Sequence, residues 1–243
     1  GKPLYDPAVL NDGRLRVLYC DSRSGSSTTI LCGSTPLHQS ARSENVSLVQ
    51  DSTTGTADYW LRSWSDPTGR GGRRTALYDK TGTEVLSFEG EQSATLQNGL
   101  LVLQESRLVD GGYVPESGYG TCQVIDLATG AALPVPEGAY SCTVCGDKLV
   151  FSCYARPEGL DAYDWDTDYR QNSWVVVQEK DGTPVYRADA ASAYRLFYDS
   201  DTLSDWVELD VATGEETTDQ ILYNTQTGEQ YTGFLQVYPG GLA

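Results

Sequence analysis

Short apolar runs alternate with polar positions along the whole chain, and clusters of Gly, Asn, Asp, Ser and Pro separate them. Alternation with a period of two is typical of β-strands that bury one face, whereas an amphipathic helix requires a period of 3.6 residues. No long stretch of the helical period is present, and the β-branched and aromatic residues that favour strands are frequent. The pattern therefore predicts an all-β protein.

One predicted strand recurs at intervals of about 47 residues, a period that indicates a propeller or another repeat array. The recurring strings are Thr29–Leu31, Ala76–Asp79, Gln123–Asp126, Val175–Gln178 and Ile221–Asn224. Each of the last four strings leads into a turn that ends in glycine, at Gly82, Gly130, Gly182 and Gly228. Such turns favour glycine because one of their residues has a positive φ angle.

Each repeat can be divided into four strands, and short turn signals join the first strand to the second. In the third repeat this signal is Asn98-Gly99, the strongest sequence indication of a two-residue hairpin. In the first repeat, Asn11-Asp12-Gly13 is expected to join a strand at Pro7–Leu10 to one at Arg14–Cys20. We therefore expect every repeat to form one four-stranded antiparallel sheet.

Five such sheets can bury both of their faces only by stacking on one another, and a ring leaves only short, protected edges. We predict a single five-bladed β-propeller domain over 1–243, all-β, with four-stranded antiparallel blades. The blades are expected at about 5–35, 45–88, 93–136, 140–188 and 193–233, and 234–238 is expected as a strand that closes the ring. The alternative is an open or truncated array that continues in a longer protein.

Charge excludes one class of partner. The 243 residues include 34 Asp and Glu and 17 Lys and Arg, so the net charge is −17. Nucleic-acid binding depends on neutralising phosphates with basic side chains, and we therefore expect no nucleic-acid partner. No apolar run of 18 residues occurs, so we expect no transmembrane segment.

The six cysteines are an even number, as is usual for disulfides in an exported protein. Cys20 and Cys32 are expected on neighbouring strands and form one candidate pair, and the other pairings stay open. Cys142 and Cys145 have half of a zinc or redox signature, but a second pair at similar spacing and a βαβ context are missing. We expect export to the cell surface. This expectation rests on the cysteines and the acidity alone, since no signal or anchor segment is visible.

The long loop expected at 156–172 carries two kinds of candidate site. Asp164, Asp166 and Asp168 occupy alternate positions, and carboxylates spaced in this way can converge on Ca²⁺. The loop is not an EF-hand, because Tyr169 and Val175 stand where that motif has Gly and Glu. A solvated acidic loop is the alternative, and no other cofactor is expected.

Aromatic residues in the same loop are candidates for binding a sugar ring or an apolar surface. They are Tyr163, Trp165 and Tyr169. The tryptophans of predicted strands are instead expected in the core: Trp60, Trp64, Trp174 and Trp206. His38 is the only histidine, so a Ser-His-Asp or Cys-His site would require it. No nucleophile motif is found near His38, and we expect a structural role.

The segment Tyr5–Tyr19, with its Asp6-Pro7 pair, resembles the first blade of the five-bladed propeller glycosidases of the arabinanase and xylosidase group. The resemblance implies that Asp6 is a general base in a central channel. That family also requires a general acid, which Glu158 matches weakly, and a third carboxylate. The inner strands of the second and third repeats offer Ser47 and Thr95 instead of carboxylates, whereas glycoside hydrolysis needs two acids at one bond.

The glycine turns resemble those of quinoprotein-like and other bacterial propeller repeats, and this resemblance implies the architecture only. We therefore expect a non-catalytic, exported binding module that presents a loop face to a glycan, a peptide or a protein partner. One alternative is a glycoside hydrolase with carboxylates in the central channel. The other is a structural module of a surface assembly. Fold alone does not choose among these functions.

Overall fold

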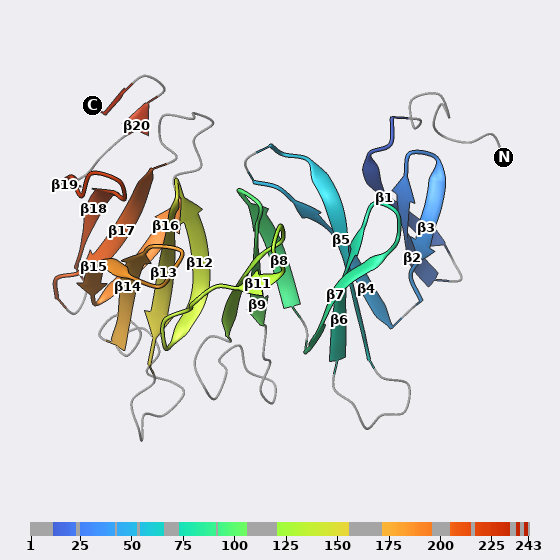
Figure 1. Ribbon diagram of the computed structural model, residues 1–243, viewed down its shortest axis with the longest axis horizontal. Coiled ribbons are helices and arrows are strands. Elements are labelled where there is room, and N and C mark those ends of the chain that lie inside the picture. The colour runs from blue at the N-terminus through green and yellow to red at the C-terminus, as the bar shows by residue number, and fades with distance from the viewer. Residues whose placement is uncertain are drawn as a thin grey trace. The chain divides into compact units, whose positions relative to one another are not determined.

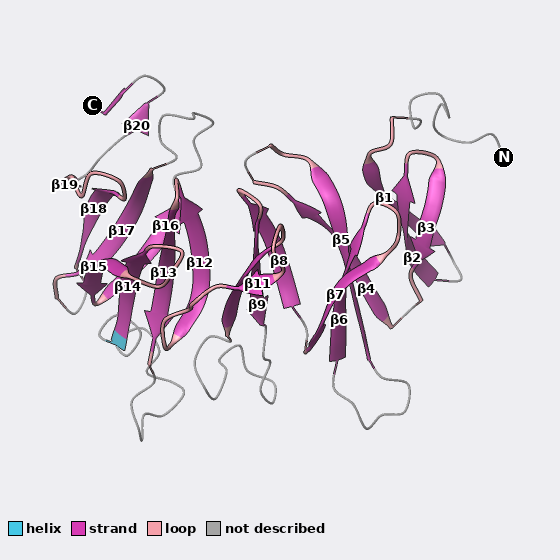
Figure 2. Ribbon diagram, in the orientation of Figure 1, coloured by secondary structure: helices cyan, strands magenta, loops and turns pink. Residues whose placement is uncertain are grey.

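The computed structural model describes residues 12–22, 25–41, 43–52, 54–65, 73–90, 92–105, 121–155, 172–195, 205–214, 217–233, 237–238 and 241–242. Apart from a single helical position at Asn172, the regular elements in these ranges are β-strands (Figure 2). The chain divides into two compact units, Gly1–Ser106 and Arg107–Ala243. The boundary between them falls within the third sequence repeat.

The first unit contains two antiparallel sheets and a hairpin (Figure 1). The strands of the first sheet, in spatial order, are β1 (Leu15–Ser22), β2 (Gly25–Cys32) and β3 (Thr35–Gln39). Those of the second sheet are β4 (Glu44–Gln50), β5 (Ala57–Ser65), β6 (Arg73–Asp79) and β7 (Glu84–Glu89). The hairpin consists of β8 (Gln92–Gln97) and β9 (Leu100–Glu105).

The second unit starts with the short hairpin of β10 (Cys122–Asp126) and β11 (Ala131–Ala132). A four-stranded antiparallel sheet follows, with β12 (Ala139–Cys145), β13 (Lys148–Tyr154), β14 (Ser173–Gln178) and β15 (Pro184–Asp189) in spatial order. A second one contains β16 (Ala191–Arg195), β17 (Trp206–Ala212), β18 (Thr218–Asn224) and β19 (Gln230–Thr232). The last two strands, β20 (Val237–Tyr238) and β21 (Gly241–Leu242), pair with each other.

The all-β class and the antiparallel sheets are confirmed, and the sheets occur at the positions of the sequence repeats. The described first sheet has three strands, because the strand predicted at 7–10 lies outside the described residues. The strand predicted at 234–238 is partly described, as β20, which forms a hairpin with β21. A closed ring of five blades, formed by a single domain, stays a prediction.

The turns between third and fourth strands explain the repeated sequence signal. In the second sheet, the Asp79 carboxylate accepts hydrogen bonds from the backbone N–H groups of Thr81 and Thr83, at 2.8 and 3.0 Å. Gly82 then takes a φ angle of 84°, which a side chain would strain, and donates its N–H to the Asp79 carbonyl. Short polar residues and glycine are therefore frequent here because they satisfy the turn backbone.

One hydrophobic cluster of the first unit lies between the first and second sheets and contains the buried residues Leu15, Ile30, Val46 and Trp60. Trp60 is 2% exposed and donates its indole N–H to the Asp79 carbonyl at 3.1 Å. Its ring stacks on Tyr78 at 4.4 Å between centroids and on His38 at 5.5 Å. The core role predicted for Trp60 and the structural role predicted for His38 agree with these contacts.

One hydrophobic cluster of the second unit lies between its two four-stranded sheets. The buried residues of this cluster are Cys145, Val150, Val175, Val177, Ala188, Ala191, Val207, Leu209 and Tyr223. The remaining strand tryptophans are only half-buried, namely Trp64, Trp174 and Trp206. Guanidinium groups cover two of them, Arg62 over Trp64 and Arg187 over Trp174. The core prediction for these three tryptophans is therefore met only in part. A ring on the surface of a sheet can instead pack beneath a cation, as two of them do.

The candidate disulfide between Cys20 and Cys32 is wrong. The register of β1 and β2 places Cys20 opposite Ser27 and Cys32 opposite Leu15, at different ends of the strand pair. A disulfide requires Cα atoms within about 7 Å of each other, which this register does not provide. Cys32 is a free thiol, and so are four further cysteines: Cys122, Cys142, Cys145 and Cys153.

Candidate functional site

The residues singled out in the sequence for binding and catalysis lie outside the described residues. This applies to Tyr163, Trp165 and Tyr169, to Asp164, Asp166 and Asp168, and to Asp6. Their roles in ligand binding, in Ca²⁺ binding and as a general base stay predictions. Within the described ranges, no group of three or more His, Cys, Asp and Glu side chains is arranged to hold a metal ion.

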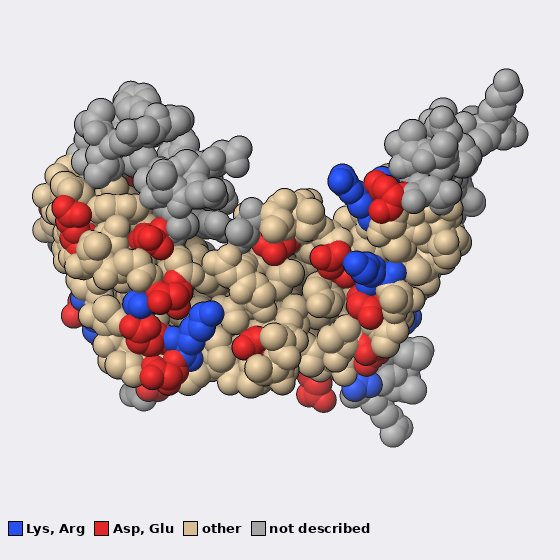
Figure 3. Space-filling model, turned by 45° about the horizontal axis from the view of Figure 1, so that its top comes forward, with Lys and Arg blue, Asp and Glu red and all other residues tan. Residues whose placement is uncertain are grey.

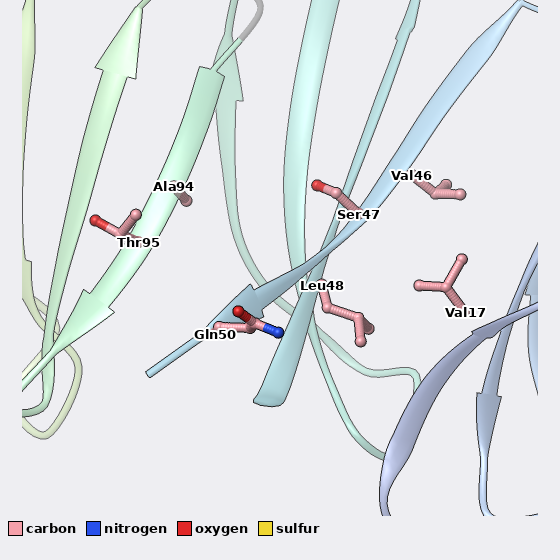
Figure 4. Close-up of a pocket in the computed structure, with 7 residues that line it drawn as sticks. All are labelled: Val17, Val46, Ser47, Leu48, Gln50, Ala94 and Thr95. Carbon is pink, nitrogen blue, oxygen red and sulfur yellow. The ribbon is translucent and has the colours of Figure 1, made fainter. Parts of the chain in front are cut away.

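An open cavity of about 490 Å³ among the described residues of the first unit is a candidate site (Figure 4). It lies along the first strands of successive repeats, β4 and β8, and faces β1. Its lining residues are Val17, Val46, Ser47, Leu48, Gln50, Ala94 and Thr95. The structure thus brings together Ser47 and Thr95, the two inner-strand residues that the sequence repeat had placed at equivalent positions.

Strand alternation gives the cavity two kinds of wall. Val46 and Leu48 extend from one side of β4 toward Val17 of β1, and Ser47 extends from the opposite side (Figure 4). The cavity therefore follows the edge of β4 and contacts both of its faces. The N–H of Ser52 donates to the Leu96 carbonyl at 2.8 Å, and this contact holds the end of β4 beside β8.

The named lining groups are all neutral. Ser47 and Gln50 are exposed, and their side chains form no hydrogen bond with the described part of the chain. The Thr95 hydroxyl accepts one long hydrogen bond, 3.4 Å, from the Gln97 amide. Aliphatic walls with unengaged hydroxyl and carboxamide groups at the rim suit a neutral ligand that has both apolar and hydrogen-bonding parts.

β1 adds an exposed apolar surface at the side of the cavity. Its consecutive residues Val17, Leu18 and Tyr19 are 44%, 36% and 64% exposed. Among the described strands, β1 pairs only with β2, so no other described strand is hydrogen-bonded to the edge along Val17–Tyr19. Three neighbouring apolar side chains on an open strand edge are unusual, since such edges promote association with other chains. Sequence patterning missed this feature because an apolar run was expected to be buried.

A charged turn lies immediately before β1. The Arg16 guanidinium donates to both oxygens of the Asp12 carboxylate, at 2.8 and 2.7 Å, and the N–H of Arg14 donates to the same carboxylate at 3.1 Å. The hydrogen bond from Arg16, together with that from Arg14, lowers the pKa of Asp12 to about 2. The turn is thereby held against the start of β1 across the physiological pH range.

Behind the cavity wall, Glu44 at the start of β4 anchors an ionic network. Its side chain is 9% exposed, and it accepts hydrogen bonds from Arg62 and, at 2.8 Å, from His38. Burial acts to raise the pKa of Glu44, but the hydrogen bonds from Arg62, His38 and the Ala41 N–H outweigh it and lower that pKa to about 2. Glu44 is therefore ionised, and its carboxylate has a structural role.

A pair of carboxylates in the second unit escaped the sequence analysis. Glu208 and Asp210 alternate with the buried Val207 and Leu209 along β17. This period of two is visible in the sequence and could have indicated that both carboxylates lie on one face of a strand. Burial raises the pKa of both groups, and the charge of Asp210 raises that of Glu208 further. The Gln220 amide donates to Glu208 at 3.0 Å, whereas Asp210 Oδ1 is buried and accepts no hydrogen bond. Among the described residues, no further group joins this pair to form a site.

The surface charge is mixed at short range. Figure 3 shows acidic side chains spread over the visible face, with Lys or Arg beside several of them. The ion pair of Lys148 with Glu179, at 3.0 Å, is one such contact. In the described part of the chain, none of the helical structure is long and apolar enough to cross a membrane.

Comparisons with known proteins find likeness at the level of the fold only. No protein-family description matches the chain, and no curated protein matches it. The structure is similar to one described as the eukaryotic initiation factor, with a TM-score of 0.55, 10% identity, and coverage of 92% of this chain and 52% of that one. It is also similar to a structure from a study of two prolyl endopeptidases, with a TM-score of 0.51, 13% identity, and coverage of 89% and 32%.

These neighbours are β-propeller-type proteins, so the likeness supports a propeller-type all-β architecture. Identities of 10% and 13% show the fold alone and leave the function open. The chain spans about half of the first neighbour's length and about a third of the second's.

Proposed function

We propose that this protein is a non-catalytic interaction module that holds an extended polypeptide segment of a partner protein in the cavity beside β1. One observation carries the proposal: a neutral, aliphatic cavity opens beside a strand edge that exposes Val17, Leu18 and Tyr19. The module is expected at the cell surface, on the acidity of the chain. The cysteines that are free thiols give no argument for export, because that argument required disulfides.

The backbone around the cavity favours a polypeptide. Among the described strands, β1, β4 and β8 pair only with β2, β5 and β9, respectively, and the residues just after β4 form one bridge with Leu96 of β8. An extended segment can add to such an edge, where its main chain bonds to unpaired N–H and C=O groups and its alternate side chains enter pockets. A neutral ligand without a regular backbone would leave these groups to water.

The side chains favour an aliphatic anchor over a sugar ring. Val17, Val46, Leu48 and Ala94 form the apolar part of the lining, and no aromatic ring is among the named lining residues. Carbohydrate rings usually stack on exposed aromatic faces, and the aromatic candidates for that role lie outside the described residues. A Val, Leu or Ile side chain of the partner would contact the aliphatic walls, which exclude water from it.

The net charge predicts the character of the flanking residues. A charge of −17 attracts cationic chains at long range and accelerates their association, an effect that salt screens. We therefore expect the bound segment to have an apolar centre and basic flanks, with an association rate that falls as ionic strength rises.

The test is selection of phage-displayed random dodecapeptides on the full-length protein, followed by affinity measurement on the selected peptides. We expect enrichment of sequences with apolar residues at alternate positions. Val17→Lys should weaken their binding at least about tenfold, because a charge enters the apolar wall. Val85→Lys is the matched control, since Val85 is equally exposed, at 42%, but lies on the outer strand β7.

Two results would contradict the proposal: no peptide is enriched, or the selected peptides bind equally to the two lysine variants. Incubation with plant and bacterial oligosaccharides separates the other functions. Retained but uncleaved sugar would support a glycan-binding module. Cleavage that is lost in Asp6→Asn would establish the glycoside hydrolase alternative. If neither peptides nor sugars are bound or cleaved, the result would favour a structural module.

A further inference from the structure

We propose that the partner segment adds as a fifth strand to the free edge of β4, so that its side chains alternate between an apolar and a polar wall of the cavity. This inference deepens the proposed function above and rests on it. It names the strand that binds the main chain of the segment and the residues that the segment needs. β1 then supplies an apolar side chain to the site and no main-chain contact.

The cavity follows β4 more closely than any other described strand. Four of its seven named lining residues belong to β4, namely Val46, Ser47, Leu48 and Gln50, whereas β1 contributes Val17 alone. β4 is also the end strand of its four-stranded sheet and pairs only with β5 among the described strands. An extended segment that adds to β4 would therefore bond to its backbone along the whole cavity.

The edge of β4 that turns away from β5 already makes one strand contact. The N–H of Asp51, the residue after β4, donates to the Thr56 carbonyl on the β5 side at 2.7 Å. On the other side, Asp51 forms a parallel bridge with Leu96 of β8, where the Ser52 N–H donates to the Leu96 carbonyl at 2.8 Å. Another backbone can therefore reach this edge, and the bridge closes the site at the end near Gln50.

The two faces of β4 differ in chemistry, and an added strand would contact both of them. Val46 and Leu48 extend toward Val17 of β1 (Figure 4). Ser47 extends to the opposite side, toward β8 (Figure 4). Successive side chains of an added strand also point to opposite faces of the sheet. Alternate residues of the segment would therefore contact aliphatic side chains, and the residues between them would contact the hydroxyl groups of Ser47 and Thr95.

This alternation determines the kind of residue at each position of the segment. Large aliphatic residues fit the apolar wall, because contact with it removes their surface from water. Small residues that form hydrogen bonds, such as Ser, Thr and Asn, fit the polar wall, because a hydroxyl that loses water without gaining a partner is costly. The segment therefore alternates large aliphatic and small polar residues along the part of β4 that spans Val46–Gln50.

Amide hydrogen exchange, followed by NMR on the full-length protein, shows which strand binds the main chain. The probe is the most enriched of the dodecapeptides selected above, at a saturating concentration. In β4, alternate N–H groups bond to β5, and those between them face the free edge. We expect the peptide to slow the exchange of these edge-facing amides at least about tenfold, and to leave the amides of β1 unchanged.

A substitution at the polar wall tests the alternation. Ser47→Leu should bind the selected peptides at least about fivefold more weakly, because the wall that faces their small polar residues loses a hydroxyl group and narrows. Asn45→Leu is the matched control. Asn45 is exposed on the same face of β4, two residues earlier, but is not among the named lining residues.

Three results would overturn the inference, and they separate it from the proposed function. Slower exchange in β1 without any change in β4 would overturn the inference and leave the proposed function in place. Equal affinity of the peptides for the Ser47→Leu and Asn45→Leu variants would do the same. Failure of the selection to enrich any peptide would overturn the proposed function and this inference together.

Discussion

At the scale of single residues, the most informative side chain is Glu44, a nearly buried carboxylate that is held by Arg62 and His38. A buried charge is costly unless it is paired and hydrogen-bonded, and this one has both kinds of compensation. The network connects β3, β4 and β5 behind the cavity wall. It therefore supports the strand from which Val46 and Leu48 reach the cavity.

We expect Glu44→Gln to destabilise the protein by roughly 1–3 kcal/mol at pH 7, because Arg62 loses its anionic partner. The pKa of Glu44 falls from 4.5 to about 2 on folding, so its contribution is complete above pH 4.5 and is lost as the pH falls toward 2. Urea unfolding at several pH values measures both effects. The exposed Glu89→Gln is the control, and a Glu44→Gln deficit that stayed constant down to pH 2 would refute the assignment.

Single residues also show what sequence reasoning could recover. The position of Trp60 on a predicted strand predicted its burial, and the repeat placed Ser47 and Thr95 at equivalent inner positions, where one cavity joins them. The pairing of Cys20 with Cys32 failed, because strand neighbourhood is local whereas register depends on the turn between the strands. The exposure of Val17–Tyr19 could not be predicted from the sequence either, since the burial of an apolar strand depends on what packs over it.

At the scale of elements, the connection from β11 to β12 shows how closely a backbone approaches its neighbours. Gly138 has a φ angle of 74°, and a Cβ atom there would lie 2.7 Å from the Tyr154 carbonyl oxygen and 3.0 Å from the Trp174 ring. Gly130, in the turn between β10 and β11, has a φ angle of 71° and open space around the same position. The two glycines therefore differ in packing but not in backbone conformation.

Substitution of each glycine by alanine separates these two effects. Gly130→Ala should cost about 1 kcal/mol, the strain of a left-handed backbone. Gly138→Ala should cost at least about 2 kcal/mol more, because the backbone carbonyl of Tyr154 cannot move without breaking strand contacts. Chemical denaturation measures the difference. Equal costs would mean that the connection shifts freely and that β12 and β13 do not fix it.

At the scale of the whole molecule, the division into Gly1–Ser106 and Arg107–Ala243 cuts through the third sequence repeat. The hairpin β8–β9 belongs to the first unit, and β10 and β11 belong to the second. A repeat that is shared between two units is the arrangement expected if neither unit is an independent domain. In repeat architectures, stability depends on the interfaces between neighbouring repeats as well as on each repeat.

We therefore expect one cooperative unfolding transition for the full chain. Scanning calorimetry should give a calorimetric enthalpy close to the van't Hoff enthalpy, as for a two-state unit. Val102→Ala provides a second reading, since Val102 is 2% exposed on β9, next to the division. It should lower the single melting temperature without splitting the peak. Two separated transitions, only one of them displaced by Val102→Ala, would show two independent domains.

The stacked rings have a consequence for following such a transition. Trp60 and Tyr78 lie 4.4 Å apart in the first unit, and Tyr186 and Tyr223 lie 4.2 Å apart in the second. Closely stacked chromophores in a fixed, asymmetric setting absorb left and right circularly polarised light unequally. Both units therefore contribute fixed ring packing to the near-ultraviolet circular dichroism, which follows the loss of this packing on unfolding without any label.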